Sequence, residues 1–225
     1  MSGRKDEWTT TTWKGDRLMR QQYIFIFSLT IALLSGAIQA QDKFSDLKSA
    51  IVSGNVVISN IHGNGASSGS AIEAVIENRT NSKIRIYTQL DDPLYLGNET
   101  SQSSQNMLAF EVYGEGGTYY SDGTNSFIEL SPNQRMRVDM TAYCTDYYKD
   151  NPSYNDRFKT AATPDDIEDI ANKIANYTKR SSVVDITTGA QVALWLGQGL
   201  SPNEIKETFP FSSRDQAIAK EILRE

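Results

Sequence analysis

One stretch decides the fold: residues 134–144 read QRMRVDMTAYC and alternate in polarity along their whole length. Successive side chains of a β-strand point to opposite faces, so this alternation predicts a strand with one apolar and one polar face. The apolar face, predicted to point into the core, holds Met136, Val138, Met140, Ala142 and Cys144. The other face holds Arg135, Arg137, Asp139, Thr141 and Tyr143. Cys144 is therefore a small buried apolar residue, a thiol joined to another molecule, or a chemically used thiol.

Five more segments alternate or are rich in β-branched and aromatic residues, and turn-forming clusters such as Gly63-Asn64-Gly65 and Ser131-Pro132-Asn133 separate them. These expected strands are residues 56–61, 71–77, 83–88, 107–113 and 126–130. Six short strands at this spacing predict an antiparallel β-sandwich over residues 56–150. A weak helical period before them predicts a short lead-in helix over residues 41–55, ended by Gly54.

After Pro152 the pattern becomes helical. Thr163 and Pro164 precede an apolar stripe at helical spacing, and a second helix is expected to begin near Thr188. Capping boxes are predicted at Ser201 and Ser213. Strands followed by helices indicate an α+β fold, an antiparallel β-sandwich followed by a small C-terminal helical subdomain, residues 151–225, packed on the sandwich.

The start of the chain predicts export. A basic residue, Arg20, precedes an apolar run over residues 24–34, and the small residue Ala40 follows, as in a secretory signal peptide over residues 19–40. Residues 1–18 show no helical or strand period, so we expect translation to begin at Met19. The alternative is an uncleaved anchor. Both place the mature protein outside the cytoplasm, secreted, periplasmic or at the cell surface, with no other membrane segment expected.

Composition excludes several classes of function. The chain of 225 residues has 22 basic and 28 acidic residues, a net charge of −6, which argues against nucleic-acid binding. One Cys and one His rule out most metal and nucleophile-base chemistry, because a zinc site needs three or four ligands and a Cys nucleophile needs a nearby base. We therefore expect no metal, no cofactor and no enzymatic turnover, and a hydrolase lacks a suitable base.

Two short motifs stand out: Ala142-Tyr143-Cys144-Thr145-Asp146 at a strand end, and QVALW over residues 191–195 on a helix. Together they resemble the two halves of the bacterial surface thioester domain. The resemblance implies that Cys144 is acylated by Gln191 with loss of ammonia, with Trp195 packing one turn on and Tyr143 and Asp146 in support. It also implies covalent capture of amines. The spacing of Cys144 and Gln191 is shorter than the family usually has.

A broader resemblance covers most of the mature chain. It includes residues 77–81, the run Gln105-Asn106-Met107, residues 143–146 and the helix with QVALW. These features look like an exported, uncharacterised bacterial β-sandwich module, which implies no activity but treats strands and helices as one unit.

The remaining candidates are weaker. His62, in a predicted turn, is more typical of an exposed His than of a base. Asp91 and Asp92 lack regular calcium-ligand spacing. Lys149 is expected to pair with Asp146 or Asp150.

Tyrosines suggest a contact surface, because each ring buries much area at low entropic cost. The alternative is that half of them cover the junction between the sheet and the helices. These tyrosines are Tyr143, Tyr147, Tyr148 and Tyr154, with Tyr113, Tyr119 and Tyr120 nearby in strand order. The sequence thus favours an exported, non-catalytic interaction or adhesion module whose partner is an unknown protein or glycan. The alternative is a self-acylated thioester protein.

Overall fold

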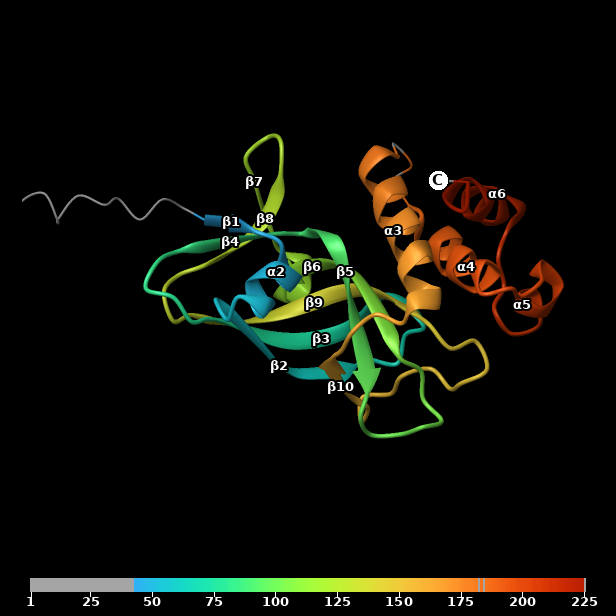
Figure 1. Cartoon of the computed structure of the whole chain (residues 1–225), viewed down its shortest axis with the longest axis horizontal. Coiled ribbons are helices and arrows are strands. Elements are labelled where there is room, and N and C mark those ends of the chain that lie inside the picture. The colour runs from blue at the N-terminus through green and yellow to red at the C-terminus, as the bar shows by residue number, and fades with distance from the viewer. Residues whose placement is uncertain (1–42, 182, 184, 225) are drawn as a thin grey trace, which may run out of the picture. The chain divides into compact units, whose positions relative to one another are not determined.

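The computed structural model describes residues 43–224 except 182 and 184. The expected signal peptide, residues 19–40, and the segment 1–18 lie outside the described residues. Ten strands, four α-helices after them and one helix near the start make up the described chain (Figure 1). The strands are β1 Lys43–Ser45, β2 Val56–Gly63, β3 Ser68–Asn78, β4 Ile84–Tyr87, β5 Gln89–Asn98, β6 Met107–Gly114, β7 Tyr120–Ser121, β8 Ser126–Leu130, β9 Arg135–Cys144 and β10 Arg157–Thr160. The helices are α2 Leu47–Val52, α3 Asp165–Arg180, α4 Thr187–Gly197, α5 Pro202–Thr208 and α6 Ser213–Ile222, with a short 3-10 turn η1 at Glu115–Gly117.

The strands form a closed barrel and a separate sheet. The barrel order is β10-β2-β3-β9-β6-β5, and all its pairs are antiparallel. The second sheet has the order β1-β4-β8-β7, with β1 parallel to β4. The prediction of an antiparallel β-sandwich is therefore wrong, and the fold is only partly consistent with the expected α+β class.

Two strands that the sequence pattern did not indicate explain this correction. All six predicted strands are present. β5 is one of the strands that were not predicted, because the polar pair Asp91 and Asp92 and also Pro93 mask its strand pattern. β10 is only four residues long and lies in a segment expected to be helical. Because β10 pairs with both β2 and β5, these two unexpected strands join the ends of the sheet and close it.

β9 is the central strand that positions the site. It pairs with β3 along one edge and β6 along the other, with register shifts in both pairs that let the sheet bend. Val138, Met140, Ala142 and Cys144 are buried, which confirms the predicted inward face, and Met136 is half-buried. Tyr143 lies on the opposite face, yet only 3 % of it is exposed, because Phe110 packs on its ring and the start of α4 at Thr187 lies beside it.

Helices α3 to α6 follow the barrel in the chain and lie together at one side of it, whereas α2 lies apart from them (Figure 1). The predicted capping box at Ser201 is confirmed, with Ser201 accepting from the Glu204 amide. The second box is shifted by one residue, because Ser212 is the cap that bonds to Asp215. α3 begins after Pro164 without a side-chain cap, so Thr163 does not serve the predicted role. Of the lead-in helix predicted over residues 41–55, only α2 is helical among the described residues, while Lys43–Ser45 form β1, and Gly54 follows α2 at φ +72°.

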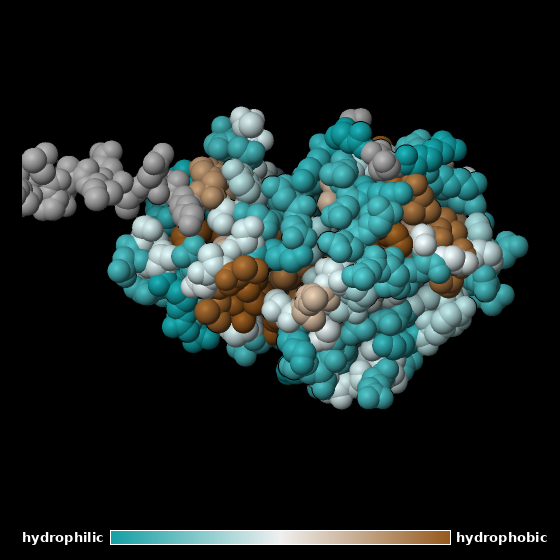
Figure 2. Space-filling model, in the orientation of Figure 1, coloured by the Kyte–Doolittle hydropathy of each residue, from teal (hydrophilic) through white to brown (hydrophobic). Residues whose placement is uncertain are grey.

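A continuous apolar core joins the barrel, the second sheet and the helices. The outer surface is mostly hydrophilic in the view of Figure 2, apart from hydrophobic areas that include one over α2. Val52 of α2 is 82 % exposed. Among the described residues, no helix has both the length and the apolar character needed to cross a lipid bilayer.

Candidate functional site

Cys144 ends β9 inside the protein. Its side chain has no exposed surface, and its Sγ lies 3.5 Å from Sδ of Met107, the residue opposite it on β6. Burial, with a smaller effect of the Asp146 carboxylate, raises the pKa of the Cys144 thiol well above its ordinary value. The thiol is therefore protonated at neutral pH and sheltered from water.

Gln191 of α4 contacts the same residue, although the two are 47 positions apart in the chain. The Cys144 backbone N–H donates to Oε1 of Gln191 at 2.9 Å, and Nε2 of Gln191 donates to the Cys144 carbonyl oxygen at 2.8 Å. Gln191 has no exposed surface. The structure thus brings together the two residues that the thioester resemblance pairs, with the carboxamide bonded to the backbone of Cys144.

The position of α4 follows from its composition and from close packing. Seven of its eleven residues are buried, so the helix is enclosed and not merely docked by one stripe. A Cβ on Gly189 would lie 2.6 Å from Cγ2 of Ile218, and one on Gly197 would lie 2.6 Å from Cδ1 of Ile170. These glycines let α6 and α3 approach α4 closely, which holds Gln191 against the end of β9.

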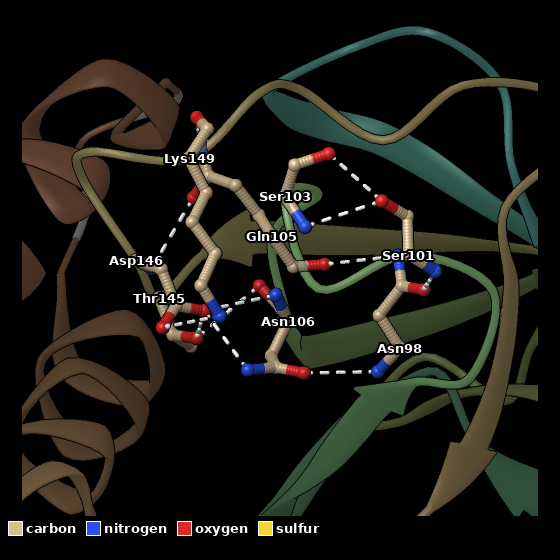
Figure 3. A network of polar contacts seen from close by, with 8 residues as sticks. All are labelled: Asn98, Ser101, Ser103, Gln105, Asn106, Thr145, Asp146 and Lys149. Carbon is tan, nitrogen blue, oxygen red and sulfur yellow. Dashed lines mark hydrogen bonds and ion pairs between the residues drawn. The ribbon is translucent and has the colours of Figure 1, made fainter.

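A network of polar contacts fixes the two loops beside Cys144 (Figure 3). One oxygen of Asp146 accepts from the backbone and side-chain nitrogens of Asn106, both at 2.9 Å. The Asn106 side-chain oxygen in turn accepts from the Asn98 backbone at 2.9 Å. The Gln105 side chain connects the same two loops, because it accepts from the Asp146 N–H at 3.2 Å and donates to the Lys149 carbonyl at 3.1 Å. The loop after β9 is thereby held to the loop between β5 and β6.

Trp195 lies one turn beyond Gln191 and forms the floor of an aromatic cluster. Its ring meets Tyr147 edge to face at a centroid distance of 5.2 Å, and Phe209 does the same from the other direction, also at 5.2 Å. Only 3 % of Trp195 is exposed, and its Nε1 has no hydrogen-bond partner among the described residues. Tyr147 is anchored by hydrogen bonds with the Glu204 carbonyl and the Thr208 hydroxyl.

This cluster lines a hollow of about 650 Å³ that we term the aromatic pocket. Aromatic side chains form part of its wall, and the pinned loops contribute polar groups. Tyr148, which packs edge to face on Tyr147, is 82 % exposed. The residues that define the pocket are Gln105, Tyr147, Tyr148, Lys149, Trp195 and Phe209. Its size suits a small ligand or an anchoring side chain of a partner.

The other predicted tyrosines do not join this pocket. Tyr143 is buried beneath α4, and Tyr154 is 66 % exposed elsewhere. Tyr113 and Tyr119 pack edge to face near η1, and Tyr120 stacks on Phe127 of β8. The single Tyr-rich surface expected from strand order is therefore not formed, and its tyrosines are spread over several parts of the molecule.

The weaker candidates adopt structural roles. His62 lies in β2, not in a turn, and Nε2 is 3.9 Å from Glu73. Asp91 pairs with Lys179 and Asp92 with Lys48, each at 2.6 Å. The predicted pairing of Lys149 with Asp146 is confirmed at 3.2 Å.

Within residues 43–224, apart from the two omitted positions, no group of three or more His, Cys, Asp or Glu side chains is arranged to hold a metal ion. Sequence reasoning missed Met107 as the neighbour of the thiol and Phe209 as a wall of the pocket. The run Gln105-Asn106-Met107 was visible as part of the broader resemblance, but its contacts depend on β6 lying beside β9. Phe209 follows α5 and carried no signal in the sequence.

Comparison of the chain with known protein families, with curated proteins and with solved structures finds no match. The candidate site is therefore interpreted from its own geometry.

Proposed function

We propose that this protein is an exported, non-catalytic interaction module that works at the cell envelope or outside the cell. The observation that supports this best is the aromatic pocket, with the highly exposed Tyr148 at its side. Tyrosines in such positions bind proteins and glycans well, because a rigid ring offers a large contact area at low entropic cost. The expected partner is a protein or a glycan.

Rigidity of the pocket supports the same proposal. The Asp146 network holds in place the loops that carry Gln105 and Lys149. Tyr147 is hydrogen-bonded to Glu204 and Thr208 of α5. A surface that is already ordered loses little conformational entropy when a partner binds. The ion pair between Lys149 and Asp146 leaves little free positive charge for an anionic partner.

The test is binding of the full chain to a printed glycan array and to a panel of immobilised extracellular proteins. We expect at least one ligand to bind, and Tyr148→Ala to weaken that binding about tenfold or more, as for a central aromatic contact. Tyr154→Ala is the matched control, because Tyr154 is also a largely exposed tyrosine but lies outside the pocket. Equal losses in the two variants, or no bound ligand, would contradict the proposal.

A second candidate is the internal thioester, which the direct contact of Gln191 with Cys144 favours. In this reaction Sγ of Cys144 bonds to Cδ of Gln191, the bond from Cδ to Nε2 breaks, and the thiol proton leaves with the nitrogen as ammonia. The Cys144 N–H, already donating to Oε1, would stabilise the negative charge that develops on that oxygen. Complete burial of both residues would protect the product from water.

Two features make the thioester the second candidate and not the first. The raised pKa of Cys144 keeps the sulfur protonated and weakly nucleophilic. The thiol also lies against the Met107 sulfur, and the amide of Gln191 is engaged by the backbone.

Intact-mass measurement of protein purified without amines tests this candidate. A thioester lowers the mass by about 17 Da through loss of ammonia, and methylamine opens the bond to give N-methylglutamine and a free thiol, which leaves the mass about 14 Da above that of the unmodified chain. Cys144→Ala should show neither effect. A full mass that methylamine leaves unchanged would eliminate the thioester and would leave the interaction module unaffected.

A further inference from the structure

A second hollow, independent of the aromatic pocket, lies where the separate sheet meets the barrel. Its volume is about 580 Å³, and we term it the junction pocket. It is lined by the end of β4, the start of β5, β6, the turn between β7 and β8, and the end of α3. The residues used below are Tyr87, Gln89, Glu111, Tyr113, Asn125 and Lys179.

The walls of the junction pocket are held in place by short contacts. Thr88 donates its N–H to the Ser126 carbonyl at 3.0 Å and accepts from the Val112 N–H at 2.7 Å, which ties both sheets together at the pocket. The turn that carries Asn125 is fixed by Asp122, whose carboxylate accepts from the backbone of Thr124 and Asn125. The pocket is thus preformed from rigid elements.

The lining is polar in a way that suits one ligand chemistry. Among the described residues that line it, none is aliphatic, and the side chains carry hydroxyl, amide and charged groups. Hydroxyl groups of a sugar both donate and accept hydrogen bonds, and the C–H face of a sugar ring packs on aromatic rings. Tyr87 provides a ring that is stacked on Phe44 at 5.3 Å and is therefore held in one orientation.

One side chain that lines the junction pocket, Gln89, has a hydrogen-bond donor without a partner among the described residues. The amide nitrogen of Gln89 is buried and has no hydrogen-bond partner within the described part of the chain. Buried donors are nearly always paired, so Gln89 has a hydrogen bond left to make, and a ligand hydroxyl can accept it once the side chain turns its amide nitrogen toward the pocket. Glu111 and Tyr113 both line the pocket, and the Glu111 carboxylate has lone pairs that can accept from ligand hydroxyls.

Charge selects against anionic ligands. Lys179 is neutralised by Asp91 at 2.6 Å across the rim. Glu111 has no ion-pair partner among the described residues, so it is the uncompensated charge of the junction pocket. A negatively charged ligand would be repelled here, and a neutral one would not.

From these observations we propose that the junction pocket binds a neutral saccharide, with the sugar against Tyr87 and its hydroxyls hydrogen-bonded to Glu111, Gln89 and Asn125. This site is separate from the aromatic pocket, and the inference stands whether or not that pocket binds a partner.

Saturation-transfer NMR and calorimetry on the full chain test the proposal with maltose, cellobiose, lactose and N,N′-diacetylchitobiose, and with glucuronic acid as the anionic counterpart. We expect at least one neutral sugar to bind with a dissociation constant of about 10 mM or lower, the range of small polar ligands. Glucuronic acid should bind at least about tenfold more weakly. Absence of binding by all four neutral sugars, or stronger binding of glucuronic acid, would overturn the proposal.

Three variants test whether the sugar binds in the junction pocket, and one of them is conservative, so that the test does not depend on a single variant that fails to fold. Tyr87→Ala should weaken sugar binding about tenfold or more. Glu111→Gln preserves the side-chain volume and should reduce the discrimination against glucuronic acid, which a purely structural role of Glu111 would not do. Tyr148→Ala, in the aromatic pocket, should bind the sugar as the parent chain does. Sugar binding that Tyr148→Ala removes, or that Tyr87→Ala and Glu111→Gln leave unchanged, would refute the assignment to the junction pocket.

Discussion

Gln191 is the residue on which the arrangement of the site depends most directly. A glutamine in an enclosed helix would normally be unfavourable, since its amide loses water without replacement. Here both ends of the amide bond to the backbone of Cys144, where β9 ends and the ladder of strand hydrogen bonds stops. The side chain therefore connects a helix to a strand end in the way that a neighbouring strand would.

Replacing Gln191 with methionine should destabilise the protein by about 2 kcal/mol, because the Cys144 carbonyl is left buried without its partner. Urea unfolding followed by circular dichroism measures this change. Gln198→Met is the control, since Gln198 is half-buried at the end of the same helix and donates locally to the Leu194 carbonyl. A loss in Gln191→Met no larger than in Gln198→Met would show that the contact does not contribute to stability.

The thiol of Cys144 predicts a dependence of stability on alkaline pH. Its pKa is raised in the folded state, so the folded protein keeps this proton while the unfolded chain releases it above the ordinary value of 9.0. The unfolded state is then favoured as pH rises, and stability falls by up to about 1.4 kcal/mol per pH unit from this group. Below that pH the contribution of Cys144 is constant.

Unfolding free energies between pH 8 and 10 (about the range in which a free thiol titrates) measure this effect. Cys144→Ala should show a shallower decline than the parent chain over that interval. Tyr143 and Tyr113 also have raised pKa values, from 10.0, and add to the decline at higher pH in both proteins. Identical slopes for parent and variant would mean that Cys144 does not control the decline.

At the scale of elements, the barrel depends on how closely β10 and its loop approach β2. A Cβ on Gly63 would lie 2.8 Å from the Ser153 carbonyl oxygen and 2.9 Å from Cβ of Pro152, so the loop before β10 can pass only over a glycine. Gly97, on β5 at the other side of β10, has ordinary space, with Ala161 Cβ at 3.8 Å.

These two glycines give a matched pair of variants. Gly63→Ala should destabilise the protein by about 2 kcal/mol through overpacking, as expected for an insertion into a tight contact. Gly97→Ala should change the stability by less than about 0.5 kcal/mol, since neither space nor backbone conformation opposes it. Thermal unfolding of both variants decides the matter, and a similar loss in the two would argue that β10 is not held this closely.

The elements that could be predicted from the sequence are those whose pattern is local. The alternation in residues 134–144 correctly placed Cys144 inside, and five other strands followed from the same period. The start of α4 and the box at Ser201 came from capping residues and apolar spacing. The proximity of Gln191 and Cys144 came from the thioester resemblance, and local pattern alone did not indicate it.

The features that could not be predicted depend on pairing between distant segments. β10 has four residues, and only its contacts with β2 and β5 make it a strand. Tyr143 points outward from the strand as predicted, but α4 covers it. The alternation within the strand gives no information on this packing of a distant helix. Both pockets likewise gather residues from several elements, so no single stretch of sequence carries their pattern.

At the scale of the whole molecule, one core connects the barrel to the helices. Leu47 of α2, Met140 of β9 and Ile222 of α6 are all fully buried members of it. A shared core of this kind favours cooperative unfolding, since no part can lose its packing alone.

We therefore expect the helices and the barrel to unfold in a single transition. The chain has three tryptophans, so a variant with Trp8→Phe and Trp13→Phe leaves Trp195 of α4 as the only tryptophan reporter of the helical part. Its fluorescence should change together with the far-ultraviolet circular dichroism of the strands during heating. Two separate transitions would show that the helices form an independently unfolding unit.

Closure of the barrel by β10 also affects the order and the rate of folding. Arg157 of β10 pairs with His62 of β2, and every other barrel strand lies between them in the chain. The pairing of β10 with β2, which closes the barrel, can therefore form only after both strands have been synthesised and have come into contact. Contacts of such long sequence separation slow folding, so the nascent chain carries an open sheet edge until late and is most exposed to aggregation in that interval.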